Sequence, residues 1–156
     1  MTRIKALVCF LPFALVRQAL AQPPGDFPLE TLIAGSDLIV VGSVASKDGP
    51  KGCHLRLPHT EDEVEFQCSD YQVTVATVLL DRRNAMRGDS VSIVARDSPP
   101  APDRQVPQLR PDVAYLFLLK SLPGDASRFY LPDYYKHYRP STEQRVQAVE
   151  RALSLR

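Results

Sequence analysis

Two cysteines and two histidines lie close together in the sequence, at Cys53, His54, His59 and Cys68. Thiolate sulfur and imidazole nitrogen are ligands that zinc prefers in proteins. The adjacent Cys53-His54 pair and the long gap before Cys68 match none of the usual zinc spacings. A disulfide between the two cysteines is the alternative that we favour, and we expect no metal site. Zinc analysis together with a free-thiol count distinguishes the two interpretations.

A second cluster is aromatic and basic. Residues 129–139 carry five aromatic side chains and three that are basic or imidazole. Tyrosine and arginine are enriched in binding hot spots, so this segment is a candidate recognition surface. The interpretation that we favour is packing, in which the rings cover one end of the domain and seat the last helix. The candidate binding residues are Tyr134, Tyr135, His137, Tyr138 and Arg139.

Motifs of known catalytic sites are absent from the sequence. It contains no Gly-x-Ser-x-Gly, no His-Glu-x-x-His and no glycine-rich phosphate loop. The three histidines, His54, His59 and His137, do not assemble into a recognisable triad with a nucleophile. Acidic pairs such as Glu63 with Glu65 alternate in a way that is typical of solvent-facing positions. We therefore expect a protein that is not an enzyme and uses no cofactor.

Residues 1–21 have the three parts of a cleavable secretory signal peptide. Arg3 and Lys5 are the positive start, residues 6–16 are an apolar run, and Ala19-Leu20-Ala21 is a small-x-small cleavage site. The apolar run is shorter than the roughly 20 residues that a spanning helix needs. We expect cleavage before Gln22, export to the periplasm or the extracellular space, and no membrane span in the mature chain.

Export changes the charge of the chain and the meaning of its cysteines. Removal of residues 1–21 takes away three basic residues and no acidic one, so the formal charge changes from +1 to −2. A slightly acidic chain lacks the positive field that nucleic-acid binding requires. Cys53 and Cys68 remain after Cys9 is removed, and such a pair in an oxidising compartment most simply forms a disulfide. Residues 22–156 are enough for one domain, which we expect to be monomeric.

Local patterns predict strands flanked by two helices. A short helix is expected at 28–34, and a Ser-x-x-Gln capping box at Ser141 predicts a final amphipathic helix. Long surface loops are expected at 47–62 and in the proline-rich segment 98–111. These elements predict a mainly β fold, a small antiparallel barrel or sandwich. The expected strands are 37–46, 64–77, 89–96, 113–119 and 129–131.

The apolar positions of the second expected strand change phase along its length. Even positions are apolar up to Cys68, and odd positions are apolar from Tyr71 onward. Side chains of a strand keep a period of two residues, so a change of phase across Ser69 and Asp70 predicts a bulge or a break.

Four segments resemble a family pattern: SDLIVVGSV at 36–44, YQVTVATVLL at 71–80, GDSVSI at 88–93 and YLFL at 115–118. They are similar to exported bacterial proteins with a netrin-like OB-fold barrel, the group that includes the tissue inhibitors of metalloproteinases. The resemblance implies a five-stranded OB-like barrel within residues 22–156, followed by the C-terminal helix. Those inhibitors chelate the protease zinc through the N-terminal cysteine of the mature chain, where Gln22 stands here. The resemblance therefore implies the fold and not that activity.

Export, a barrel pattern and the absence of catalytic motifs together predict a non-enzymatic domain that binds a protein or peptide partner. Two alternatives stay open. One is an inhibitor of a secreted hydrolase that acts through Pro99 to Pro111, and the other is a structural component of the cell envelope.

Overall fold

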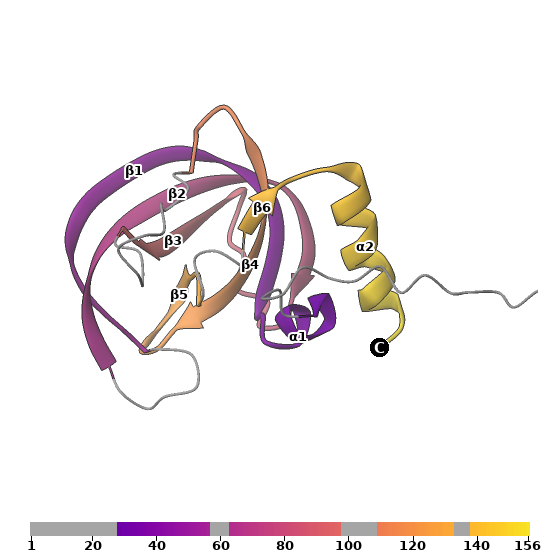
Figure 1. Ribbon diagram of the computed structural model, residues 1–156, viewed down its shortest axis with the longest axis horizontal. Coiled ribbons are helices and arrows are strands. Elements are labelled where there is room, and N and C mark those ends of the chain that lie inside the picture. The colour runs from indigo at the N-terminus through magenta and orange to yellow at the C-terminus, as the bar shows by residue number, and fades with distance from the viewer. Residues whose placement is uncertain (1–27, 57–62, 98–108, 133–137) are drawn as a thin grey trace, which may run out of the picture.

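The chain forms a mainly β structure with a helix at each end of the described part (Figure 1). The computed structural model describes residues 28–56, 63–97, 109–132 and 138–156, so the predicted signal peptide lies outside it. The mainly β class and both flanking helices are confirmed. The elements are α1 (Leu29–Ala34), β1 (Leu38–Arg56), β2 (Glu63–Asp81), β3 (Ser90–Arg96), β4 (Ala114–Leu122), β5 (Asp125–Tyr130), β6 (Tyr138–Pro140) and α2 (Glu143–Ser154).

Five strands close into a ring in the order β1-β2-β3-β5-β4, and β4 returns to pair with β1. Neighbours in this ring are antiparallel except β3 and β5, which pair in parallel from Ser92 with Arg128 to Val94 with Tyr130. The prediction of an antiparallel sheet is therefore wrong for this pair. Strand direction alternates around an antiparallel ring, so a ring of five must contain a parallel pair. The short β6 pairs with β4 as a sixth strand of the sheet.

The interior of the ring holds the largest apolar cluster. Alternate residues of each strand point inward, as the period of a strand requires. Tyr138 of β6 joins this cluster and lies edge-on to Tyr115, with ring centroids 5.6 Å apart. The buried members are Leu38, Val40, Val44, Tyr71, Val73, Val91, Ile93, Ala95, Leu109, Tyr115, Phe117, Leu119, Phe129, Leu131 and Tyr138.

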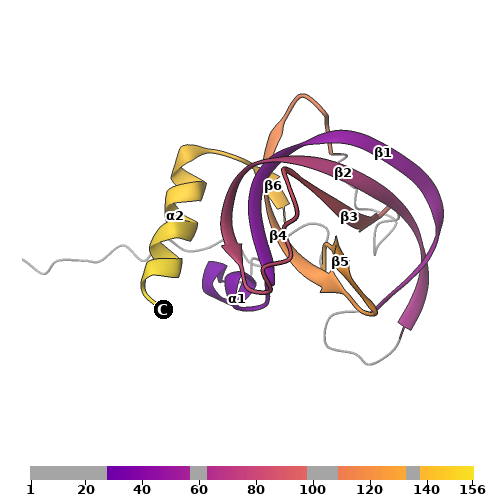
Figure 2. The same ribbon diagram turned by 180° about the vertical axis from the view of Figure 1, so that it is seen from behind.

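A second cluster lies between the two helices and the outer face of β1 and β4 (Figure 2). Ile33 of α1 and Val149 of α2 are both fully buried there. The helix α2 begins after Thr142, whose hydroxyl accepts a hydrogen bond from the backbone N–H of Arg145. The predicted cap at Ser141 is therefore wrong by one residue. The reason is that the Ser141 N–H donates to the carbonyl of Ala114, which ties this residue to β4 just before the helix begins.

The strand β1 continues through most of the segment predicted as a loop. Residues 47–56 pair with β2, so the loop at 47–62 is wrong for that part, and residues 57–62 lie outside the described chain. Register shifts absorb the irregular residues of β1. Gly49 has a φ of +130°, and a Cβ there would lie 2.7 Å from Ser69 Oγ. Pairing with β2 thus outweighs the low strand propensity of this glycine-rich segment.

The strand β2 runs without a break past Ser69 and Asp70. Its register with β3 is regular from Cys68 to Thr74, so the bulge or break predicted in this strand is wrong. The register shift lies on the opposite strand, between Asp48 and Lys51 of β1.

The change of apolar phase in β2 has a different cause, because its two halves bury opposite faces. Tyr71 points into the ring, whereas Cys68 belongs to a third cluster on the outer face of the sheet. This third cluster also contains Leu55, Val94 and Tyr130. A strand whose two halves bury opposite faces changes its apolar phase where the halves meet, and no bulge is needed there.

Asp81 ends β2 and holds the turn that leads to β3. Its carboxylate accepts hydrogen bonds from the backbone N–H groups of Ala85 and Met86, each at 3.0 Å. Burial opposes ionisation of this carboxyl, but these backbone hydrogen bonds outweigh burial and lower the pKa of Asp81 below its ordinary value.

Candidate ligand-binding site

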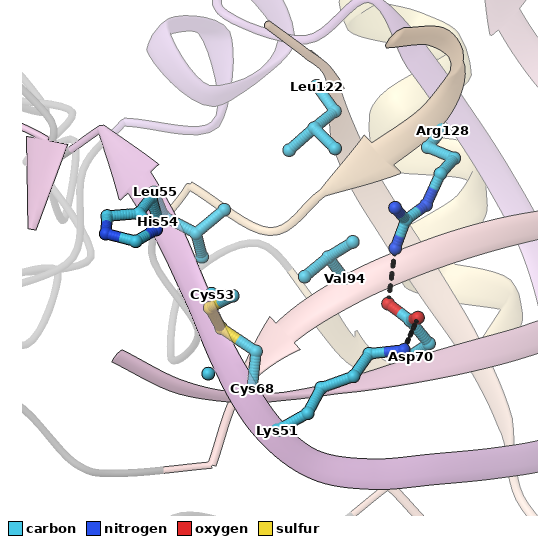
Figure 3. A pocket seen from close by; sticks show the side chains of 10 residues that line it. Lys51, Cys53, His54, Leu55, Cys68, Asp70, Val94, Leu122 and Arg128 are labelled. Carbon is cyan, nitrogen blue, oxygen red and sulfur yellow. Dashed lines mark hydrogen bonds and ion pairs between the residues drawn. A yellow bond between two sulfur atoms is a disulfide. The ribbon is translucent and has the colours of Figure 1, made fainter. Parts of the chain in front are cut away.

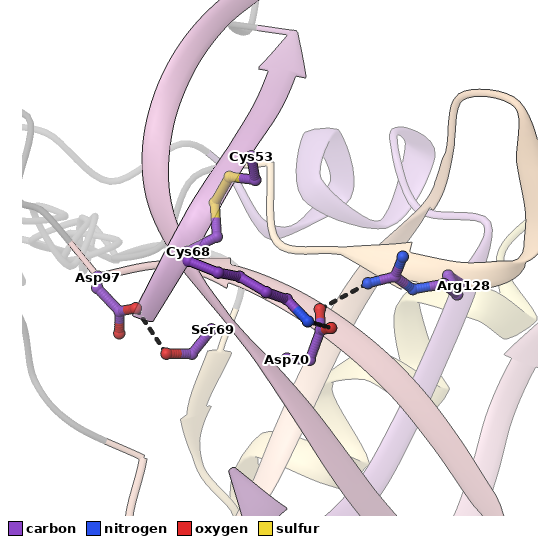
Figure 4. The surroundings of a disulfide bond; sticks show 7 residues. Cys53, Cys68, Ser69, Asp70, Asp97 and Arg128 are labelled. Carbon is purple, nitrogen blue, oxygen red and sulfur yellow. Dashed lines mark hydrogen bonds and ion pairs between the residues drawn. A yellow bond between two sulfur atoms is a disulfide. The ribbon is translucent and has the colours of Figure 1, made fainter. Parts of the chain in front are cut away.

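The ends of β1 and β2 form a curved arm, which we define as residues 51–56 paired with residues 63–68. Cys53 and Cys68 form a disulfide across this arm, with their Cα atoms 5.8 Å apart (Figure 4). The cysteines are not register partners, because Cys53 faces Phe66 and Cys68 faces Lys51. The bond therefore runs diagonally across the ladder and fixes one strand of the arm against the other.

A pocket of about 250 Å³ lies between the arm and the hairpin of β4 and β5 (Figure 3). It lies over the outer face of β2 and β3, where the third cluster is buried. All five strands of the ring contribute to it, so it exists only when the arm is curled over the sheet. Its lining residues are Lys51, Gly52, Cys53, His54, Leu55, Cys68, Asp70, Val94, Leu122 and Arg128.

Three charged residues stand together at one end of the pocket. Asp70 accepts a hydrogen bond from Arg128 Nη2 at 2.6 Å, and its other oxygen is ion-paired with Lys51. The side chains are 20% exposed for Asp70, 35% for Arg128 and 48% for Lys51. The carboxylate is thus the innermost group, and the two cations lie nearer to solvent. The hydrogen bond to Asp70 raises the pKa of Lys51, so this amine stays charged at neutral pH.

The rest of the pocket wall is apolar or neutral. Leu55 and Val94 are 5% and 4% exposed, and Leu122 is half-buried at the mouth. His54 is exposed beside them. A wall that is apolar at one end and cationic at the other suits a ligand that carries both an apolar group and an acidic one.

A polar network supports the arm behind the disulfide (Figure 4). The fully buried Ser69 donates a hydrogen bond to Asp97 at 2.6 Å, and Lys47 pairs with the other oxygen of Asp97 at 3.1 Å. Lys47 also lies over the ring of Tyr71, 5.5 Å from its centroid. These contacts anchor β1 to β2 and β3 where the strands begin to curl away from the ring.

The structure describes two of the five residues of the predicted aromatic surface. Tyr138 is 5% exposed and packs in the ring interior, and Arg139 donates a hydrogen bond to the carbonyl of Tyr138. Tyr134, Tyr135 and His137 lie outside the described residues, so their role in binding stays a prediction. The buried position of Tyr138 agrees with the packing alternative for that residue.

The pocket residues Lys51, Asp70 and Arg128 were not singled out from the sequence. One signal pointed to their neighbourhood, since Asp70 stands where the apolar phase of β2 changes. Arg128 comes from a strand more than fifty positions away, and nothing local to it marks a partner.

A metal site has no support among the described residues, where no group of three or more histidine, cysteine, aspartate or glutamate side chains could hold an ion. Cys53 and Cys68 are joined to each other, and His59 lies outside the described chain. No helix in the described ranges is long and apolar enough to cross a membrane.

Comparison of the chain with models of protein families and with curated proteins gave no match. The function must therefore be argued from the geometry of the pocket and its surroundings.

Proposed function

We propose that this chain is an exported, non-enzymatic domain of the OB type that binds a segment of a partner protein in the pocket under the arm. The observation that carries the proposal is the position of the pocket. It lies on the sheet of β2 and β3, between the β1–β2 arm and the β4–β5 hairpin. OB barrels bind oligonucleotides and oligosaccharides over strands 2 and 3, between the loops that follow strands 1 and 4, so the pocket lies at the ligand-binding face of this fold.

The strand order supports the assignment of the OB type. A five-stranded ring in the order β1-β2-β3-β5-β4 with one parallel pair is the arrangement expected of a closed Greek-key barrel of this kind. The resemblance of residues 36–131 to netrin-like barrels points to the same fold. Export is supported by the signal pattern of residues 1–21 and by the disulfide, which persists in oxidising compartments.

The size and chemistry of the pocket favour a protein segment as the ligand. A volume of about 250 Å³ holds one or two side chains and no folded domain. The wall combines three aliphatic residues with a charged cluster, which suits a peptide better than a base or a sugar. Nucleic-acid binding by an OB barrel depends on stacked aromatic rings and a positive groove, whereas this pocket wall has no phenylalanine, tyrosine or tryptophan.

Peptide selection tests this function. The full chain is immobilised and used to select from a display library of random peptides, in parallel with Leu122→Arg and Val78→Arg. Leu122 is at the pocket mouth, whereas Val78 is 45% exposed on β2 away from the pocket. We expect related peptides to be enriched by the wild type and by Val78→Arg, and lost with Leu122→Arg. Equal enrichment by Leu122→Arg, or none by the wild type, would overturn the proposal.

A further inference from the structure

One edge of β1 is without a strand partner among the described residues. β1 pairs with β4 only from Leu38 to Ser43, whereas its pairing with β2 continues to Arg56. Open edges are templates for further strands, and proteins usually guard them with bulges, proline and lysine. Register shifts after Val44 and after Asp48, together with Pro50, guard the first part of this edge.

The arm itself has none of these register shifts and no proline along its β1 strand. From Lys51 to Arg56 each residue of β1 has one partner in β2, with no register shift and no proline. This segment is therefore regular enough to accept hydrogen bonds from another extended chain along its open side. Alternate residues of a strand direct their N–H and C=O groups to the same side. An added strand would thus use every second residue of the arm.

The pocket runs along this same segment. Lys51, Cys53 and Leu55 alternate along β1, so their side chains share one face of the strand, and all three line the pocket. A strand added at the edge lies about 4.8 Å from β1 and directs alternate side chains to the same face. Those side chains would enter the pocket from its open side.

We propose that the partner of this chain is an extended segment that adds as a strand to the Lys51–Arg56 edge. It places an apolar side chain against Leu55 and Leu122, and an acidic side chain two positions along, toward Lys51 and Arg128. This inference rests on the proposed function, since it names how the same pocket recognises a protein segment.

Charge supports the acidic residue of the ligand. Among the residues that line the pocket, two cations share the single carboxylate of Asp70. Asp48 contacts Lys51 at 3.6 Å but is 87% exposed outside the pocket, and Asp125 acts on Arg128 from the first position of β5. Because both cations are more exposed than Asp70, an incoming carboxylate can approach them without displacing it. The contribution of the acidic residue should weaken as the salt concentration rises.

The test uses a fluorescein-labelled heptapeptide, Thr-Thr-Leu-Thr-Glu-Thr-Thr, and fluorescence anisotropy with the full chain. Two further peptides carry N-methyl groups on alternate residues, one set on the odd positions and the other on the even positions. N-methylation removes the N–H donor, so only one set blocks the ladder with β1. We expect one methylated peptide to bind about tenfold more weakly and the other within about threefold of the parent.

Replacement of Glu by Gln in the peptide is expected to weaken binding about fivefold at low salt. Arg128→Gln should remove this preference, and the matched variant Arg151→Gln, in an exposed residue of α2, should keep it. Equal binding of both methylated peptides, or no preference for Glu, would overturn strand addition with an acidic ligand. So would failure of the heptapeptide to bind.

These outcomes are separable from failure of the proposed function. If library peptides are enriched through the pocket while both methylated forms of those peptides bind equally, the pocket is a binding site and the strand mode is wrong. If the library selection does not depend on Leu122, both proposals fail together.

Discussion

Replacement of both Cys53 and Cys68 by alanine should destabilise the protein mainly through its unfolded state. The bond closes a segment with a sequence separation of 15 residues. The chain-entropy estimate for a loop of this length is about 3 kcal/mol, which corresponds to a fall in Tm of roughly 10 °C for a chain of this size. Alanine is preferred to serine because a hydroxyl at the fully buried Cys68 would lie among apolar side chains.

Urea unfolding followed by circular dichroism measures the loss. The oxidised wild type, the wild type with reductant and the double variant are compared, and reductant should not change the variant. If the reduced wild type and the double variant have the same free energy of unfolding, the loss of stability comes from the missing cross-link and not from the packing of the sulfur atoms. A double variant within about 1 kcal/mol of the oxidised wild type would refute the reasoning, because the arm would then keep its ends together in the unfolded chain.

Three further predictions concern single residues. Asp70→Asn should lower the free energy of unfolding by about 1 kcal/mol, and the loss measured in urea should shrink at high salt. Asp81 has a lowered pKa when folded, so it stabilises the fold above the pKa of the unfolded carboxyl, about 4, and this contribution is lost as pH falls from there through the lower pKa of the folded carboxyl. Asp81→Asn should therefore flatten the fall in stability between about pH 5 and pH 3, as thermal melts would show. Gly42→Ala should destabilise by about 2 kcal/mol or more, because its Cβ would meet the Thr74 carbonyl oxygen. Gly52→Ala, whose Cβ has no neighbour nearer than 3.5 Å, is the matched control and should melt close to the wild type.

The parts of the fold that could be predicted from the sequence are those with a local periodic signal. Alternating apolar residues located β3, a continuous apolar run located β4, and the Leu29–Ala34 helix followed from its apolar spacing and from Gly35. The β1 side of the arm could not be predicted, since Lys47 to Arg56 has no alternation and becomes a strand only through pairing with β2. Tertiary pairing decided the structure of this segment against its local propensity.

The pocket could not be predicted from the sequence for a related reason. Its charged end joins Lys51, Asp70 and Arg128, which come from three strands and meet because the sheet curls. Only the pairing of the two cysteines was accessible, through the argument from export and an even cysteine count. The phase change near Asp70 was visible but admitted two explanations, and a second core on the opposite face is the one that the structure contains.

The packing of α1 against α2 affects the order in which the chain can be completed during synthesis. Ile33 of α1 and Val149 of α2 are both fully buried in the second cluster, and Arg156 donates a hydrogen bond to the carbonyl of Glu30. The second cluster is therefore complete only after α2, which follows every strand in the chain, has been synthesised. A nascent chain that lacks α2 exposes the outer apolar face of β1 and β4, including Ile39, Leu116 and Leu118. Such a chain is vulnerable to aggregation and proteolysis until its last helix has been made and docked.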